Sequence, residues 1–129
     1  MLKPSLDKVV GIIVGLGVPG LILLTMIGGA GGAAAGATAI TAALATFGPG
    51  GMVGGIITLP IAVIVLKGVS EYGVEKILVQ VLKEMKSKGH SKNELLNKIE
   101  KYPVSKKLKL SLKEKIKEFY STNTITVVS

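Results

Sequence analysis

The chain has 129 residues, a formal net charge of +8 and a hydrophobic fraction of 48%. Its length corresponds to one domain of ordinary size, and the absence of cysteine excludes disulfide bonds, thiolate catalysis and cysteine metal sites. All sixteen basic residues are lysine, so bidentate guanidinium contacts with phosphate or carboxylate are excluded as well.

An uncharged stretch of 58 positions, residues 9–66, dominates the first half of the chain and includes fourteen glycines and three prolines. Because backbone polar groups in lipid must be satisfied within the segment itself, such a stretch is typical of helices in a bilayer. The sequence therefore predicts an all-α protein with two to three glycine-rich transmembrane helices, followed by a small basic helical bundle.

Glycine clusters at residues 28–32 and 48–51 divide the uncharged stretch into three candidate spans, which belong to a predicted glycine-rich membrane region of residues 1–66. The candidate spans cover residues 9–27, 33–47 and 52–66. The first contains Pro19, which is expected to kink it. The second is mostly alanine, which contributes little to membrane insertion, so both two and three crossings stay open.

The first span has one competing interpretation, a cleaved signal peptide. Its apolar stretch is longer than usual for such a peptide, and Asp7 lies in the charged segment before it. A membrane span is therefore the favoured interpretation.

Several glycines are spaced four residues apart, which places small residues on one face of a helix. In lipid such a face lets two helix backbones approach closely, so the spacing predicts helix packing and a homo-oligomer. The alternative is a glycine-rich hairpin that packs loosely. The predicted helix-packing residues are Gly11, Gly15, Gly28, Gly32, Gly36, Gly50, Gly51, Gly54 and Gly55.

Residues 38–55 read as an Ala/Thr-rich helix, a glycine-rich turn with a Gly-Gly-Met step, and the start of a second apolar helix. This pattern resembles the glycine-rich hydrophobic hairpins of small bacterial membrane proteins. The resemblance implies a helical membrane hairpin and carries over no catalytic residue.

Residues 67–120 are predicted to form a lysine-rich domain of amphipathic helices. Gly89 is expected to stop the first helix, and the sequence from Ser91 to Glu94 is typical of a capping box that opens the second. The second helix should end before Pro103, and a third should begin at Ser105. Residues 121–129 are expected to form a flexible tail. The predicted apolar faces comprise Val69, Ile77, Leu78, Val81, Leu82, Met85, Leu95, Leu96, Ile99, Leu108, Leu112, Ile116 and Phe119.

Twelve lysines and four glutamates lie between Lys83 and Lys117, a local excess of eight positive charges. This pattern is interpreted as a solvated helix face, as a patch for anionic lipid headgroups, or, least favoured, as a nucleic-acid contact. By the positive-inside rule the basic domain is predicted to lie on the cytoplasmic side of a membrane. The residues predicted to contact lipid or a partner are Lys83, Lys86, Lys88, Lys92, Lys106, Lys107, Lys109 and Lys113.

No residue pattern in the chain predicts catalysis. His90 is the only histidine, lies in a Gly-His-Ser turn and is expected to be a surface residue. The glutamates alternate with lysines as on exposed helix faces, and the glycine clusters lack the lysine of a phosphate-binding loop. The sequence therefore predicts a protein that is not an enzyme, with no catalytic residue, cofactor, metal site or small-molecule substrate.

Together these features predict a multi-pass membrane protein that oligomerises and permeabilises the bilayer, as holin-like or toxin-type pore-forming proteins do. The alternative is a non-catalytic membrane anchor, or an assembly protein such as a coat or shell subunit. In that alternative the basic helical domain binds a cytoplasmic partner, anionic lipid or nucleic acid.

Overall fold

The structure is a computed structural model that describes residues 4–29, 36, 38, 40–42, 44 and 58–128, the last six without their side chains. The helices delimited within these residues confirm the all-α prediction for this part of the chain. They are α1 (Leu6–Leu16), α2 (Val18–Ile27), α4 (Leu59–Tyr72), α5 (Val74–Ser87), α6 (Lys92–Glu100) and α7 (Lys106–Val128).

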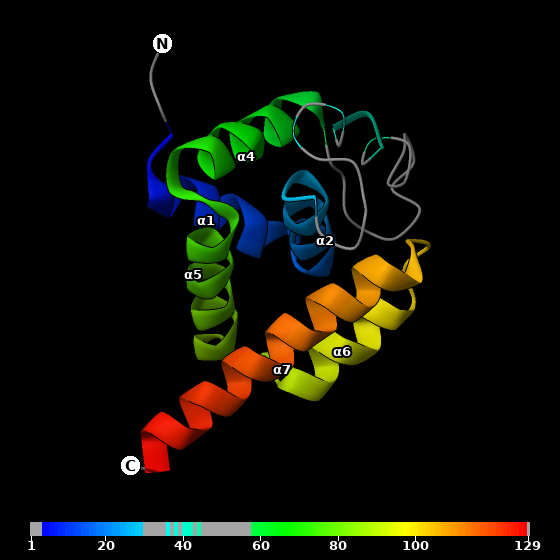
Figure 1. Ribbon diagram of the computed structural model, residues 1–129. Coiled ribbons are helices and arrows are strands. Elements are labelled where there is room, and N and C mark those ends of the chain that lie inside the picture. The colour runs from blue at the N-terminus through cyan, green and yellow to red at the C-terminus, as the bar shows by residue number, and fades with distance from the viewer. Residues whose placement is uncertain are drawn as a thin grey trace.

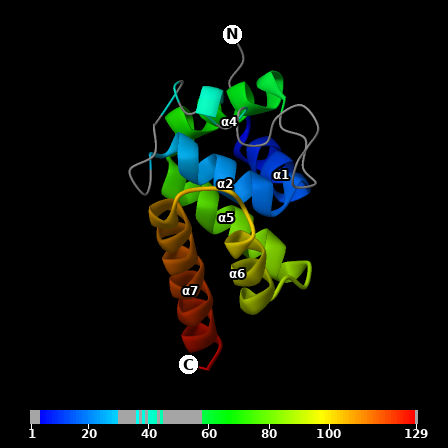
Figure 2. The ribbon, with the colours of Figure 1, turned by 90° about the vertical axis from the view of Figure 1, so that its right-hand side faces the viewer.

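Helix α2 lies at the centre of the molecule, with the other delimited helices around it (Figures 1 and 2). All ten of its residues are buried, and it packs against α1, α4, α5, α6 and α7. A helix that is apolar around its whole circumference needs an apolar environment on every side. Here the neighbouring helices supply that environment, because each of them turns buried apolar side chains inward.

The predicted membrane spans are not found among the described residues, where no helix is both long enough and apolar enough to cross a bilayer. The predicted span over residues 9–27 is broken at Gly17, whose φ of 75° ends α1 and which is followed by Pro19 in the first turn of α2. The resulting helices of 11 and 10 residues are each roughly 15 Å long, half of a ~30 Å hydrocarbon core. The prediction of a multi-pass membrane protein is therefore wrong.

Half of the other two predicted spans, 15 of their 30 residues, lies outside the described residues. The described end of the third belongs to α4, which has Pro60 in its first turn and crosses residue 67 to reach Tyr72. The hydroxyl of Tyr72 donates a hydrogen bond to the carbonyl of Pro4 at 2.9 Å, so the end of α4 is tied to the start of the described chain. The division into regions 1–66 and 67–120 stays a prediction.

The functions that depended on these spans are corrected with them. A pore-forming, holin-like or toxin-type protein and a membrane anchor all require a helix that crosses the bilayer, and the described residues contain none. A coat or shell subunit was expected to bury its apolar helices against neighbouring copies. The most apolar described helix, α2, is instead buried within its own chain.

The helix boundaries after residue 67 follow local signals, as the sequence predicts. The hydroxyl oxygen of Ser91 accepts a hydrogen bond from the Glu94 N–H at 3.1 Å and opens α6. Gly89 has a φ of 95° just after α5, and α6 ends before Pro103. Ser105 Oγ accepts from the Leu108 N–H at 3.2 Å at the start of α7.

Helix α7 extends beyond the body of the molecule toward the C-terminus (Figure 1). Its backbone is helical to Val128, through most of the segment that was expected to form a tail. The flexibility of this end stays a prediction. Within the body of the molecule its apolar face is buried, as predicted, at Leu108, Leu112 and Ile116.

Candidate functional site

Helices α6 and α7 lie side by side and antiparallel, and two of the predicted surface lysines hold them together. Lys109 Nζ donates a hydrogen bond to the backbone carbonyl of Glu100 at 2.8 Å, and Lys113 pairs with the Glu100 carboxylate. Because the last carbonyls of a helix carry partial negative charge, ammonium groups at the end of α6 are favourable. Lys109 and Lys113 thus serve contacts within the chain.

A third predicted lysine, Lys86, lies over the ring of Tyr120, with its Nζ 5.5 Å from the ring centroid. The Tyr120 hydroxyl donates a hydrogen bond to the carbonyl of His90 at 2.7 Å. Burial raises the pKa of the Tyr120 phenol, and the negative charge of Glu94 raises it further, so the phenol stays a neutral donor. Lys86 therefore helps to fix α7 against the α5–α6 turn.

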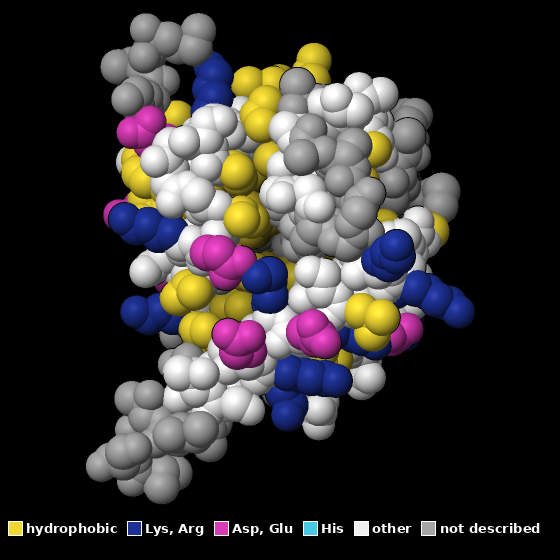
Figure 3. Space-filling view, in the orientation of Figure 1, with side chains coloured by type: hydrophobic (Ala, Val, Ile, Leu, Met, Phe, Trp, Pro, Cys, Tyr) yellow, Lys and Arg dark blue, Asp and Glu magenta, His cyan; other side chains and the backbone are white. Residues whose placement is uncertain are grey.

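The other five predicted lysines are exposed but do not form one patch. Two lie at the start of α7, next to the end of α6, and the rest lie on α5 and around the α5–α6 turn, at the opposite end of α6. Figure 3 shows dark-blue lysines intermixed with magenta acidic side chains over the lower half of one face. The five exposed lysines are Lys83, Lys88, Lys92, Lys106 and Lys107.

His90 and Glu94 form the most closely connected polar cluster of the α5–α6 turn. His90 Nδ1 lies 2.8 Å from Glu94 Oε2, and Lys98 Nζ donates to the same oxygen at 3.1 Å. The hydrogen bonds from His90 and then Lys98 lower the pKa of the Glu94 carboxyl, despite partial desolvation. A carboxylate held in its charged form by two partners is suited to fixing the start of α6 rather than to releasing a proton.

A cavity of about 420 Å³, the hairpin-end cavity, lies between the α1–α2 junction and the end of α6. One wall is mainly apolar, and the other carries two exposed lysines and a half-buried tyrosine. Burial raises the pKa of the Tyr102 phenol, and the positive charge of Lys98 opposes that rise. The cavity is lined by Leu16, Gly17, Val18, Pro19, Lys98, Lys101 and Tyr102.

Lys98 and Lys101 were not among the lysines predicted from the sequence. They lie three residues apart, at the end of a helix, and this spacing alone could have marked them as a pair on one helix face. Their apolar counterpart, residues 16–19, lies about eighty positions earlier in the chain, and nothing local in the sequence connects the two. Only the packing of α2 against α6 brings them together.

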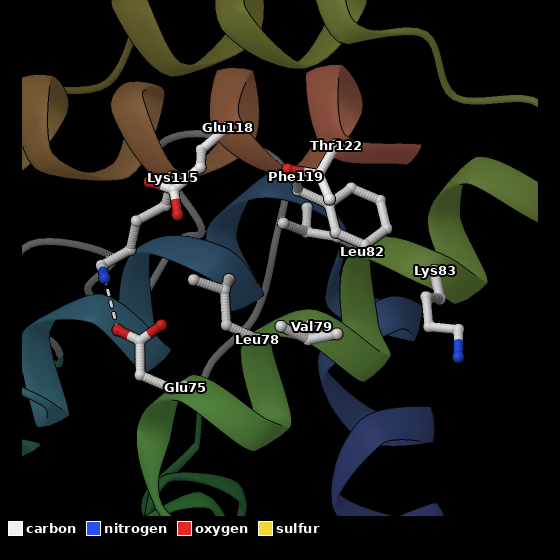
Figure 4. Close-up of a pocket in the computed structure, with 9 residues that line it drawn as sticks. All are labelled: Glu75, Leu78, Val79, Leu82, Lys83, Lys115, Glu118, Phe119 and Thr122. Atoms are coloured by element: carbon white, nitrogen blue, oxygen red, sulfur yellow. Dashed lines mark hydrogen bonds and ion pairs between the residues drawn. The ribbon is translucent and has the colours of Figure 1, made fainter. Parts of the chain in front are cut away.

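A second hollow, the α5–α7 groove, has a volume of about 370 Å³. Leu78 and Leu82 are buried at its floor, whereas Val79 is 42% exposed. Figure 4 shows these apolar side chains facing Phe119, with an ion pair between Glu75 and Lys115 that joins the two helices at one end. The groove is lined by Glu75, Leu78, Val79, Leu82, Lys83, Lys115, Glu118, Phe119 and Thr122.

The predicted helix-packing glycines have different surroundings. A Cβ added at Gly28 would lie 2.9 Å from Val74 Cγ2, so this glycine allows α2 and α5 to approach closely. A Cβ added at Gly11, Gly15 or Gly36 would meet nothing within 4 Å. The other predicted positions, Gly32, Gly50, Gly51, Gly54 and Gly55, lie outside the described residues.

Two close approaches occur at glycines that the sequence interpretation missed. A Cβ at Gly20 would lie 2.4 Å from the carbonyl oxygen of Ile13, and one at Gly68 would lie 2.7 Å from Val9 Cγ2. Gly20 therefore allows α2 to fold back against α1, and Gly68 allows α4 to pack on α1. Neither glycine has another glycine four residues away, so the spacing that predicted helix packing does not mark them.

Among the described residues, no three histidine, cysteine, aspartate or glutamate side chains are grouped so that they could hold a metal ion. Comparison with protein-family models, with curated proteins and with solved structures finds no match for this chain. The two hollows and the lysines around them are therefore the features of the described residues that indicate a function.

Proposed function

We propose that the protein is a non-catalytic binding protein that contacts anionic lipid headgroups through the end of the α6–α7 hairpin. The observation that carries this proposal is the hairpin-end cavity, where Lys98 and Lys101 stand opposite an apolar wall. An anionic lipid has the same two-part character, because its charged headgroup is joined directly to apolar chains. The proposal concerns contact with headgroups and requires no membrane-spanning helix.

The lysines around the cavity support this choice of ligand. Lys106 and Lys107 are exposed at the start of α7, a few residues beyond Lys101, and they add positive charge to the same end of the hairpin. A lysine ammonium is a strongly hydrated point charge, and each one near an anionic membrane contributes about 1 kcal/mol of attraction. Such attraction depends on the number of charges rather than on a fixed geometry.

The apolar wall favours lipid over nucleic acid. Proteins that bind single-stranded nucleic acid stack successive bases on several aromatic side chains, whereas Tyr102 is the single aromatic residue among those that line the hairpin-end cavity. In the hairpin-end cavity the wall opposite the lysines consists of Leu16, Val18 and Pro19 around Gly17, and aliphatic groups of this kind suit the glycerol and the first methylenes of an acyl chain.

Co-sedimentation with vesicles tests the proposal. The full chain is expected to bind vesicles of phosphatidylcholine containing phosphatidylglycerol and not vesicles of phosphatidylcholine alone, with binding that weakens as salt is added. Lys101→Gln is expected to lower the partition coefficient about fivefold, which corresponds to about 1 kcal/mol for one lysine at an anionic surface.

Lys76→Gln is the matched control, because Lys76 is an exposed lysine on α5 that does not line the cavity. Equal losses for the two variants would show that total charge, and not the cavity, governs binding. The proposal is overturned in favour of nucleic acid if the full chain does not bind anionic vesicles but does bind a single-stranded RNA of the same charge density.

A further inference from the structure

We propose that the α5–α7 groove is the contact surface of a weak two-fold dimer, in which the groove of one copy receives the same groove of a second. This inference goes beyond the lipid binding proposed above, since it concerns another surface and another partner. Val79 is its central residue, because it is one of three large hydrophobic side chains that are clearly exposed in the described part of the chain. The other two, Leu59 and Leu110, do not line the groove.

The charged residues around the groove are divided between its two ends. Figure 4 shows Glu75, Lys115 and Glu118 at one end, where Lys115 is already paired with Glu75, so this end keeps one net negative charge. Lys83 lies on the far side of Val79 and Phe119 (Figure 4). The groove therefore has a negative end, an apolar middle and a positive end.

A surface with this polarity is complementary to itself. In a two-fold dimer the same patch meets its own copy in the opposite direction. An axis near Val79 would place Lys83 of one copy opposite Glu118 of the other, twice in each dimer, with the apolar middles in contact. Opposite charges placed in this way fix the orientation of the two copies.

The charges around the groove sum to zero, and this neutrality matters because the chain as a whole is strongly positive. With a net charge of +8, two copies repel each other in most orientations. Around the groove two lysines are balanced by two glutamates, so this face brings two copies together without that penalty. A partner of strongly acidic or strongly basic character would gain less from such a balanced rim than a second copy does.

The small extent of the groove indicates that the dimer is weak. Stable protein interfaces bury about 1,200–2,000 Å² in total. Because the groove is formed by only parts of two helices, we expect two copies joined there to bury less than that. We therefore expect a dimer whose population rises with protein concentration rather than a permanent one.

Sedimentation velocity over a concentration series tests the proposal with the full chain. The wild-type protein is expected to shift from monomer to dimer as its concentration rises, and Val79→Lys is expected to remain monomeric. Lys83→Glu and Glu118→Lys should each weaken dimerisation by roughly tenfold, since each change acts twice in a two-fold dimer. The double variant Lys83→Glu/Glu118→Lys should restore it.

The matched controls are Lys92→Glu and Glu84→Lys, which make the same charge changes at exposed positions outside the groove. Because all these positions are exposed, the variants are expected to keep the circular dichroism spectrum of the wild type. A wild-type chain that is monomeric at every concentration overturns the proposal. So does a dimer that Lys83→Glu and Lys92→Glu weaken equally, or one that the double variant fails to restore.

Discussion

The centre of the molecule and the turn between α5 and α6 are held by different kinds of interaction. Around α2 the contacts are apolar. The one polar side chain of that helix, Thr25, donates a hydrogen bond at 2.8 Å to the carbonyl of Leu21, one turn earlier in the same helix. At the turn, three hydrogen bonds hold the chain in place. Ser91 Oγ accepts from the Glu94 N–H, His90 bonds to the Glu94 carboxylate, and the Tyr120 hydroxyl donates to the His90 carbonyl. Packing between distant helices therefore fixes the centre, whereas mostly local bonds fix the turn.

The largest loss of stability is expected from removing bulk in α2. Leu24 is 0% exposed, so Leu24→Ala leaves a cavity that five neighbouring helices cannot easily fill. We expect it to lower the free energy of unfolding by about 3 kcal/mol or more. Urea unfolding followed by circular dichroism measures the change, and Leu110→Ala, at an exposed position outside the α5–α7 groove, should stay within about 0.5 kcal/mol of wild type.

Intermediate changes in stability, of opposite sign, are expected at two glycines near the contact between α1 and α2. Gly20→Ala would force a Cβ against the Ile13 carbonyl and is expected to destabilise the protein by about 1–3 kcal/mol. Gly15→Ala, in open space on α1, is expected to stabilise it by about 0.5–1 kcal/mol, since alanine loses less backbone entropy in a helix. Thermal unfolding of both variants shows whether each substitution raises or lowers the stability. Changes of the same sign would contradict the close approach of α2 to α1.

The smallest effect is expected at the turn, and it depends on pH. Because the folded state lowers the pKa of Glu94, its contribution to stability is present above the ordinary glutamate pKa of about 4.3 and is lost as the pH falls through the lower folded value. Glu94→Gln should therefore have a melting temperature that falls less steeply with acidification than that of wild type. Melting curves from neutral to acidic pH measure this slope, and Glu114→Gln, at an exposed position on α7, should retain the wild-type slope.

The same contrast explains how much of the molecule the sequence predicts. The start of α6 at Ser91, the stop at Gly89 and the start of α7 after Ser105 each depend on a few neighbouring residues, and all three predictions are confirmed. The environment of α2 depends on helices far away in sequence. Hydrophobicity alone does not distinguish a helix covered by protein from one covered by lipid, so the span over residues 9–27 was predicted wrongly.

The candidate site divides in the same way. Composition identifies a lysine-rich segment, but it does not show that Lys109 and Lys113 bond to Glu100 while Lys106 and Lys107 stay exposed. These differences depend on how α7 lies along α6. The spacing of Lys98 and Lys101 could mark one wall of the hairpin-end cavity, but the cavity itself cannot be predicted from the sequence, because its two walls lie about eighty residues apart in the chain.

The burial of α2 on all sides also has a consequence during synthesis of the protein on the ribosome. Helix α2 is complete at Ile27, but the helices that cover it continue to α7, more than eighty residues later. At a synthesis rate of roughly 5–20 residues per second, its apolar surface lacks that cover for several seconds or more. During that interval the nascent chain exposes a helix whose one polar side chain is Thr25, which favours binding by chaperones and aggregation until α7 emerges.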